Sequence, residues 1–156
     1  MSFWEILLRL GGATLIGAAI GLNRDLGGKP IGVRTLGLVG LAGAIAAVAV
    51  APGAAGGFDP VSRVIQGALT GIGFLGAGVI VRGHDRIRGL TSAASTWVTV
   101  CLGLVCGLAA WPVVAVGAGL VFVLLLFGGP FERMSHRALA RLAGLPRGGS
   151  SDDAPP

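Results

Sequence analysis

Five apolar stretches, separated by short polar loops, constrain the fold of this chain more than any other feature of its sequence. A stretch of about 20 apolar residues is long enough for a helix to cross the hydrocarbon core of a bilayer. With 53% hydrophobic and 12% charged residues among 156, a water-soluble domain could not bury this much apolar surface. The sequence predicts an all-α, polytopic membrane helix bundle of about five transmembrane helices. The stretches are about Phe3–Leu22, Val33–Ala51, Pro60–Val81, Thr91–Ala109 and Pro112–Phe127.

Basic residues are concentrated in alternate loops, and this pattern predicts how the helices are oriented. Lys and Arg collect on the cytoplasmic side of membrane proteins. The first and third loops and the C-terminal segment would then be cytoplasmic, and the N-terminus would lie outside. Ten of the twelve Lys and Arg residues lie on that predicted side: Arg24, Lys29, Arg34, Arg82, Arg86, Arg88, Arg133, Arg137, Arg141 and Arg147.

Composition and motifs disfavour several other classes of protein. A net charge of +5 is compatible with nucleic-acid binding, but aromatic residues are not interleaved with the basic ones. Cys101 and Cys106 match neither zinc nor redox spacing, so we expect buried thiols. His84 and His136 have no partnered nucleophile in the sequence around them. We therefore expect no enzymatic activity, no cofactor, no metal site and no nucleic-acid partner.

Glycines crowd the third apolar stretch. Small residues let helix backbones approach closely in lipid, so these glycines are predicted to pack against another helix. The pattern Gly71-x-Gly73-x-x-Gly76 also matches the letters of the dinucleotide-binding fingerprint, but no strand-turn-helix context surrounds it, and a basic loop follows where an acidic residue is expected. The predicted packing positions are Gly67, Gly71, Gly73, Gly76 and Gly78.

The predicted transmembrane domain covers residues 1–129, and a C-terminal segment follows it. Residues 130–146 place apolar and basic side chains on adjacent helical stripes. This segment is therefore predicted to be either a cytoplasmic amphipathic helix on the anionic leaflet or a solvated helix end. Residues 147–156 are rich in Gly, Ser, Asp and Pro and are predicted to be disordered.

Charged residues at the helix ends are the candidates for function. Glu5 precedes Arg9 by four residues at the predicted outer side, and Asp59 precedes Arg63 by the same spacing. This order favours an ion pair on one helix face, and a charge at a membrane helix needs a partner.

A second polar cluster is predicted at the inner side, where Asn23-Arg24-Asp25 ends the first stretch and Arg34-Thr35 opens the second. It either fixes helix depth through snorkelling and ion pairing, or it forms a ligand or coupling site. The candidate functional positions at both sides are Arg9, Arg24, Asp25, Arg34, Thr35, Asp59, Arg63, Arg88 and Thr91.

Several motifs together resemble the MgtC/SapB family of membrane proteins, over roughly Glu5 to Phe127. The most specific are Gly71-Ile72-Gly73-Phe74-Leu75-Gly76-Ala77-Gly78, and Arg88-Gly89-Leu90-Thr91 followed by Ala93-Ala94-Ser95-x-Trp97-Val98-Thr99. Further matches are Arg9-Leu10, Ile20-Gly21-Leu22 with Arg24, Lys29-Pro30-x-Gly32-x-Arg34-Thr35, and Asp59-Pro60 with Arg63. The family commonly reads Glu-Arg-Glu where this chain has Asn23-Arg24-Asp25, and Arg-Thr-His where it has Arg34-Thr35-Leu36. The chain resembles a short form without the soluble C-terminal domain of founding members.

The resemblance implies a bacterial inner-membrane protein linked to magnesium homeostasis, growth at low magnesium and survival inside host cells. For the best-known members it also implies inhibition of the F-type ATP synthase. Our leading interpretation is a lipid-embedded regulator that contacts another membrane complex through its glycine-rich helix faces. The alternative is a small magnesium or monovalent cation transporter or channel acting as a homo-oligomer, although the acidic residues lie at helix ends or in loops rather than near the bilayer midplane.

Overall fold

Five helices account for most of the described chain. The structure, a computed structural model, describes residues 1–51, 59–82 and 87–142, with side chains described for 1–51, 60–80 and 89–127. A two-residue antiparallel pair, β1 (Val81–Arg82) and β2 (Ile87–Arg88), lies between the third and fourth helices in the sequence. The helices are α1 (Phe3–Leu26), α2 (Val33–Val50), α3 (Asp59–Val79), α4 (Leu90–Gly107) and α5 (Trp111–Leu142).

These helices confirm the predicted all-helical bundle, since each predicted apolar stretch corresponds to one of them. By length and composition, α1, α2 and α4 can each cross a membrane, and residues Trp111–Phe127 of α5 form a shorter apolar helical segment. The helix α3 is less apolar, because Arg63 and Gln66 lie in its first half and its several glycines lower its mean hydropathy further. The predicted orientation across the membrane stays a prediction.

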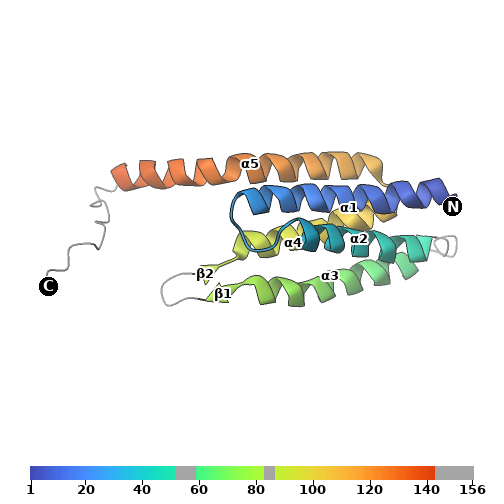
Figure 1. The fold of residues 1–156 in the computed structure, drawn as a ribbon. Helices are drawn as coiled ribbons and strands as arrows, with labels where there is room; N and C mark the ends of the chain where they lie inside the picture. Colours follow the sequence, from blue (N-terminus) through green and yellow to red (C-terminus); the bar gives the residue numbers. More distant parts are fainter. Residues whose placement is uncertain (52–58, 83–86, 143–156) are drawn as a thin grey trace. The chain divides into compact units, whose positions relative to one another are not determined.

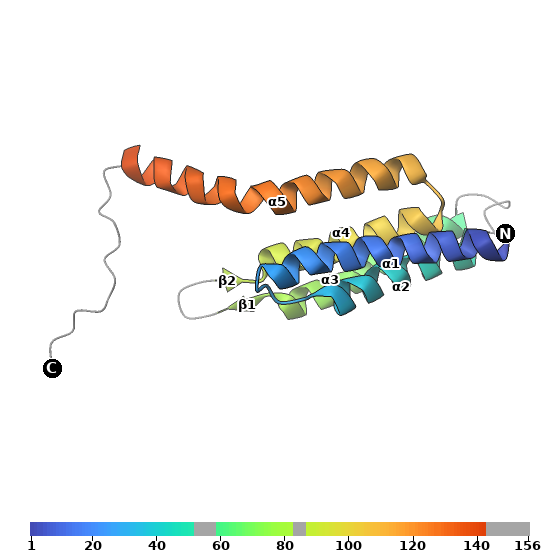
Figure 2. The ribbon, with the colours of Figure 1, turned by 45° about the horizontal axis from the view of Figure 1, so that its top comes forward.

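The chain forms two units, Met1–Phe122 and Val123–Pro156. In the first unit, α1, α2 and α4 pack against one another, and α3 packs against α4 and α2. Figures 1 and 2 show the connection from α1 to α2 at the same end of this bundle as β1 and β2, with the N-terminus at the opposite end. In the second unit, α5 continues as a helix to Leu142, so residues 130–142 are helical. Whether this part lies on a membrane surface stays a prediction, and residues 143–156 lie outside the described part of the chain.

Small residues form much of the contact among α1, α2 and α4. A Cβ atom added to Gly103 of α4 would lie 2.3 Å from the carbonyl oxygen of Gly40 of α2. A Cβ added to Gly17 of α1 would lie 2.3 Å from the carbonyl oxygen of Leu36. Lipid provides no hydrophobic drive for helix association, so such close backbone packing stabilises the bundle instead. A cluster of buried side chains lies beside these contacts and comprises Ala13, Ala44, Cys106 and Val114.

Gly89 is the N-cap residue of α4, lies against the end of α3 and must be glycine for two reasons. Its φ of 93° lies in the left-handed region, which costs other residues energy. A Cβ atom there would also lie 2.2 Å from the carbonyl oxygen of Val79. This position therefore holds the first turn of α4 close to the last turn of α3.

Candidate functional site

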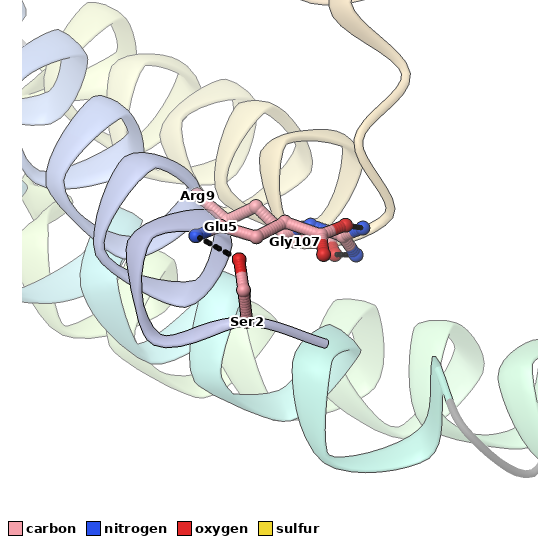
Figure 3. A network of polar contacts seen from close by, with 4 residues as sticks. All are labelled: Ser2, Glu5, Arg9 and Gly107. Atoms are coloured by element: carbon pink, nitrogen blue, oxygen red, sulfur yellow. Dashed lines mark hydrogen bonds and ion pairs between the residues drawn. The ribbon is translucent and has the colours of Figure 1, made fainter.

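The first polar site lies at the end of the bundle where α1 begins and α4 ends, here called the Arg9 end. The Ser2 side-chain oxygen accepts a hydrogen bond from the backbone N–H of Glu5 at 3.3 Å, which caps α1. Glu5 Oε1 and Arg9 Nη2 form an ion pair one turn further along, which confirms the pair predicted from their spacing. Figure 3 shows the Arg9 and Glu5 side chains meeting beside Gly107, with the Ser2 side chain directed toward the backbone nitrogen of Glu5.

Arg9 also connects α1 to α4. Its Nη1 donates a hydrogen bond of 2.8 Å to the carbonyl oxygen of Gly107, the last residue of α4. The last carbonyls of a helix have no partner within the helix and carry partial negative charge. The guanidinium, in a residue only 8% exposed, therefore meets both a carboxylate and the negative end of a helix dipole.

The second polar site lies at the opposite end, where α1 ends and α2 and α4 begin, here called the Arg24 end. Arg24 is 4% exposed, and its Nη2 donates a hydrogen bond to Ser92 Oγ in the first turn of α4. Its Nε is buried without a hydrogen-bond partner in the described part of the chain. Among the described side chains Arg24 forms no ion pair. This buried cation therefore contacts a neutral hydroxyl where Arg9 contacts a carboxylate.

Asp25, the nearest carboxylate in sequence, contacts α2. Its Oδ2 accepts a hydrogen bond of 3.0 Å from the backbone N–H of Val33, the first residue of α2. The N-cap residue of α2 is Gly32, which has no side chain to accept this bond. A Cβ added to Gly32 would lie 1.8 Å from Asp25 Oδ1, so the carboxylate occupies the space that a larger residue would need. Asp25 thus replaces the missing cap of α2.

The other predicted positions lie nearer the surface of the bundle. Arg34 and Thr35 are exposed in the first turn of α2, and Thr91 is exposed in the first turn of α4. Among the described side chains, Arg24 and Asp25 contact different helices instead of forming one inner cluster with Arg34. The side chains of Asp59 and Arg88 lie outside the described ones, so the proposed pair of Asp59 with Arg63 stays a prediction.

Sequence reasoning did not assign several residues to these sites, among them Gly107, which acts through its carbonyl oxygen, and Ser92. No side-chain pattern marks a backbone acceptor. Three other buried hydroxyls of α4 donate to the carbonyl four residues earlier, as Thr96 does to Ser92 at 2.9 Å. Ser92 instead accepts a bond from another helix, and only the packing of α1 on α4 distinguishes it. In the part of the chain searched for metal sites, which is the described part, no group of three or more His, Cys, Asp or Glu side chains could hold an ion.

The glycines of α3 are arranged differently from those at the helix contacts. A Cβ atom added at Gly67, Gly71 or Gly78 would have no atom of the described chain within 4 Å. These positions recur on one side of the helix together with Phe74, which is 83% exposed. We call Gly67, Gly71, Phe74 and Gly78 the open face of α3.

The other two predicted glycines of α3 lie off this face. Gly73 is also open, whereas a Cβ at Gly76 would contact Ala93 of α4 at 3.8 Å, an ordinary packing distance. Packing of the open face against another helix therefore stays a prediction, since no described residue lies against it.

Apolar helices packed through glycine, with charged residues at their ends, define a polytopic helical membrane protein. The model of the MgtC family matches residues 10–134. The chain belongs to the MgtC family, as its motifs predict.

Similar proteins come from several bacteria. SrpB of Synechococcus elongatus is 39% identical over 141 residues, which cover 83% of this chain and 76% of SrpB. SapB of Bacillus subtilis is 40% identical over 111 residues, covering 66% of this chain and 47% of SapB. A protein of Escherichia coli K12 with the name "Putative magnesium transporter YhiD" is 39% identical over 110 residues, covering 66% of this chain and 51% of YhiD. The matched region thus spans about half the length of SapB and YhiD, and no solved structure matches the chain.

Proposed function

We propose that this chain is a regulatory inner-membrane protein linked to magnesium homeostasis, which acts by contact with another membrane complex and not as an enzyme. Membership of the MgtC family and the name of YhiD support the link to magnesium. The F-type ATP synthase is the partner that the family resemblance favours. Basic residues in alternate loops support the proposed orientation, with the Arg24 end toward the cytoplasm.

The open face of α3 is the observation that carries this proposal. Where α1, α2 and α4 meet, several glycines bring two backbones together, as Gly40 and Gly103 do. Gly67, Gly71 and Gly78 have the same property but no neighbour among the described residues. Glycine on a lipid-facing surface lowers helix stability without improving contact with lipid. A helix of another membrane protein would use the close approach that these glycines permit.

Site-specific photo-crosslinking in living cells tests this contact. A photoreactive amino acid is placed at Phe74 on the open face, and at Leu15 of α1 as the matched control. Both positions are apolar and exposed, at 83% and 72%. We expect Phe74 to give an adduct with a membrane-embedded subunit of the F-type ATP synthase, and Leu15 to give none. Equal adducts from both positions, or no synthase adduct from Phe74, would contradict the proposal.

The alternative is a magnesium transporter or channel, which the name of YhiD favours. The acidic side chains described at the two ends are already engaged, Glu5 with Arg9 and Asp25 with Val33. Magnesium flux into liposomes that contain the purified protein separates the two functions. If the chain is a regulator, magnesium flux should be no faster than in protein-free liposomes. Flux that Asp25→Asn or Arg34→Ala abolishes would overturn the regulatory proposal, and an adduct between two copies at Phe74 would then indicate the homo-oligomer.

A further inference from the structure

Arg24 is a buried charge without an anion among the described residues. In that part of the chain its guanidinium makes one hydrogen bond, to the neutral Ser92 hydroxyl, and its Nε has no partner. A buried cation is expensive unless it is paired with an anion and fully hydrogen-bonded. Arg9, which is buried to a similar degree on the same helix, has the Glu5 carboxylate and the Gly107 carbonyl oxygen as partners, although its Nε also lacks one. Among the described side chains, the Arg24 guanidinium therefore lacks the anion that Arg9 has.

The helix that Arg24 contacts makes this imbalance larger. Ser92 belongs to the first turn of α4, where unpaired N–H groups create partial positive charge. The N-cap residue Gly89 makes no side-chain cap hydrogen bond, so the cap position itself does not neutralise these donors. The guanidinium thus lies against the positive end of a helix, whereas Arg9 lies against the negative end of the same helix. Two positive groups held together in this way are the arrangement that binds an anion.

We propose that Arg24 and the first turn of α4 bind a phosphate group. The guanidinium would donate to phosphate oxygens through groups that Ser92 leaves unused, and the backbone N–H groups of Leu90 and Thr91 would complete the site. A planar guanidinium and helical N–H groups both match the geometry of phosphate oxygens. Leu90 and Thr91 are exposed while Arg24 is buried, so the phosphate would enter from the surface of the bundle. Ser92 holds the guanidinium in place.

The phosphate can belong to a phospholipid headgroup or to free inorganic phosphate. Arg24 lies in the last turn of α1, at the level where headgroups meet the end of a membrane helix. Native mass spectrometry of the protein released from phosphatidylglycerol nanodiscs detects a retained lipid. Titration of lipid-free, detergent-solubilised protein with sodium phosphate, against sodium chloride at equal ionic strength, detects free phosphate as a rise in thermal stability. A retained lipid without a phosphate-specific rise in thermal stability identifies the phospholipid headgroup as the ligand. A phosphate-specific rise in thermal stability without a retained lipid identifies free phosphate.

Arg24→Gln and Arg9→Gln form the matched pair of variants, since each removes one buried charge of α1. A charge-assisted hydrogen bond contributes about 1.5–3 kcal/mol, so Arg24→Gln should weaken binding of the responding probe at least about tenfold. Arg9→Gln should leave that binding unchanged. Ser92→Ala replaces this variant if Arg24→Gln does not fold. It keeps the charge of Arg24 but removes the hydroxyl that positions the guanidinium, so it should also weaken binding. Neither a retained lipid nor a phosphate-specific rise in the unmodified protein, or equal losses in the Arg24 and Arg9 variants, would overturn the proposal.

Discussion

At several positions of α1, α2 and α4 glycine brings two helix backbones together, whereas the glycines on the open face of α3 contact no described residue. At Gly17, Gly40 and Gly103 the absent side chain lets the backbone of one helix touch that of another. On the open face of α3 the absent side chain leaves empty space next to the described residues. The comparison teaches that a glycine-rich membrane helix is not by itself evidence of packing within its own chain. It also divides the glycines into those that build the fold and those available for a partner.

Gly103→Val should produce the largest effect on this comparison. The new side chain would overlap the backbone of Gly40, with the nearest oxygen 2.3 Å from the Cβ position. Backbone cannot rotate away as a side chain can, so α2 and α4 would have to separate. Overpacking costs up to about 3 kcal/mol in most cores, and occasionally more. Because backbone is in the way here, we expect Gly103→Val to lower the free energy of unfolding by at least about 3 kcal/mol. Unfolding in mixed micelles with increasing SDS measures the loss.

The matching change on α3 is Gly78→Val, where the added Cβ has nothing within 4 Å. Its free energy of unfolding should stay within about 1 kcal/mol of the unmodified protein, because Val has a helix propensity similar to or better than that of Gly. Similar losses for Gly103→Val and Gly78→Val would show that the two groups of glycines do not differ as proposed.

Two glycines of α2 sharpen the comparison within a single helix. Gly40→Ala would place a Cβ 2.6 Å from the carbonyl oxygen of Ala13, whereas Gly37→Ala would meet its nearest atoms at 3.8 Å. We expect Gly40→Ala to lower the free energy of unfolding by about 1–3 kcal/mol. Gly37→Ala should raise it by up to about 1 kcal/mol, because Ala has the higher helix propensity. The same SDS titration measures both variants, and opposite signs are required.

The fold could be predicted from the sequence because lipid makes helix formation nearly obligatory. Each long apolar stretch must satisfy its backbone hydrogen bonds internally, and length alone then locates the helix. The predicted start at Val33 coincides with that of α2, and the predicted start at Phe3 with that of α1. The end of α1 was placed at Leu22, four residues before the observed end at Leu26, because the charges of Arg24 and Asp25 suggested a loop. Arg24 and Asp25 nevertheless belong to the helix, because the side chain of Arg24 is buried against α4.

The site was predictable only where its partners lie on one helix. Glu5 and Arg9 are four residues apart, so helical geometry alone brings them together. The bond from Arg24 to Ser92 joins residues separated by 68 positions, and nothing in local spacing specifies it. The packing role of Gly103 depends in the same way on where α2 lies. The Gly103-x-x-x-Gly107 spacing is typical of helix contacts and was the available signal.

Gly71→Ala should have the smallest effect on stability and the most informative effect on function. The added methyl group enters open space on α3, so the free energy of unfolding should rise by about 1 kcal/mol or less. On the open face, however, that methyl group would hold a partner helix away. The yield of the synthase adduct from a photoreactive residue at Phe74 should therefore fall severalfold.

Gly73→Ala is the control for this last change, because Gly73 is also open but lies about 200° around the helix from Gly71. It should raise stability to the same extent and leave the adduct yield unchanged. Equal loss of adduct in both variants would mean that the partner surrounds α3 instead of using one face. No loss in either would mean that the approach is not close enough to require glycine, and the open face would then be a lipid-facing surface. The two variants thus separate the glycines that a partner needs from those that are merely exposed, which stability measurements alone cannot do.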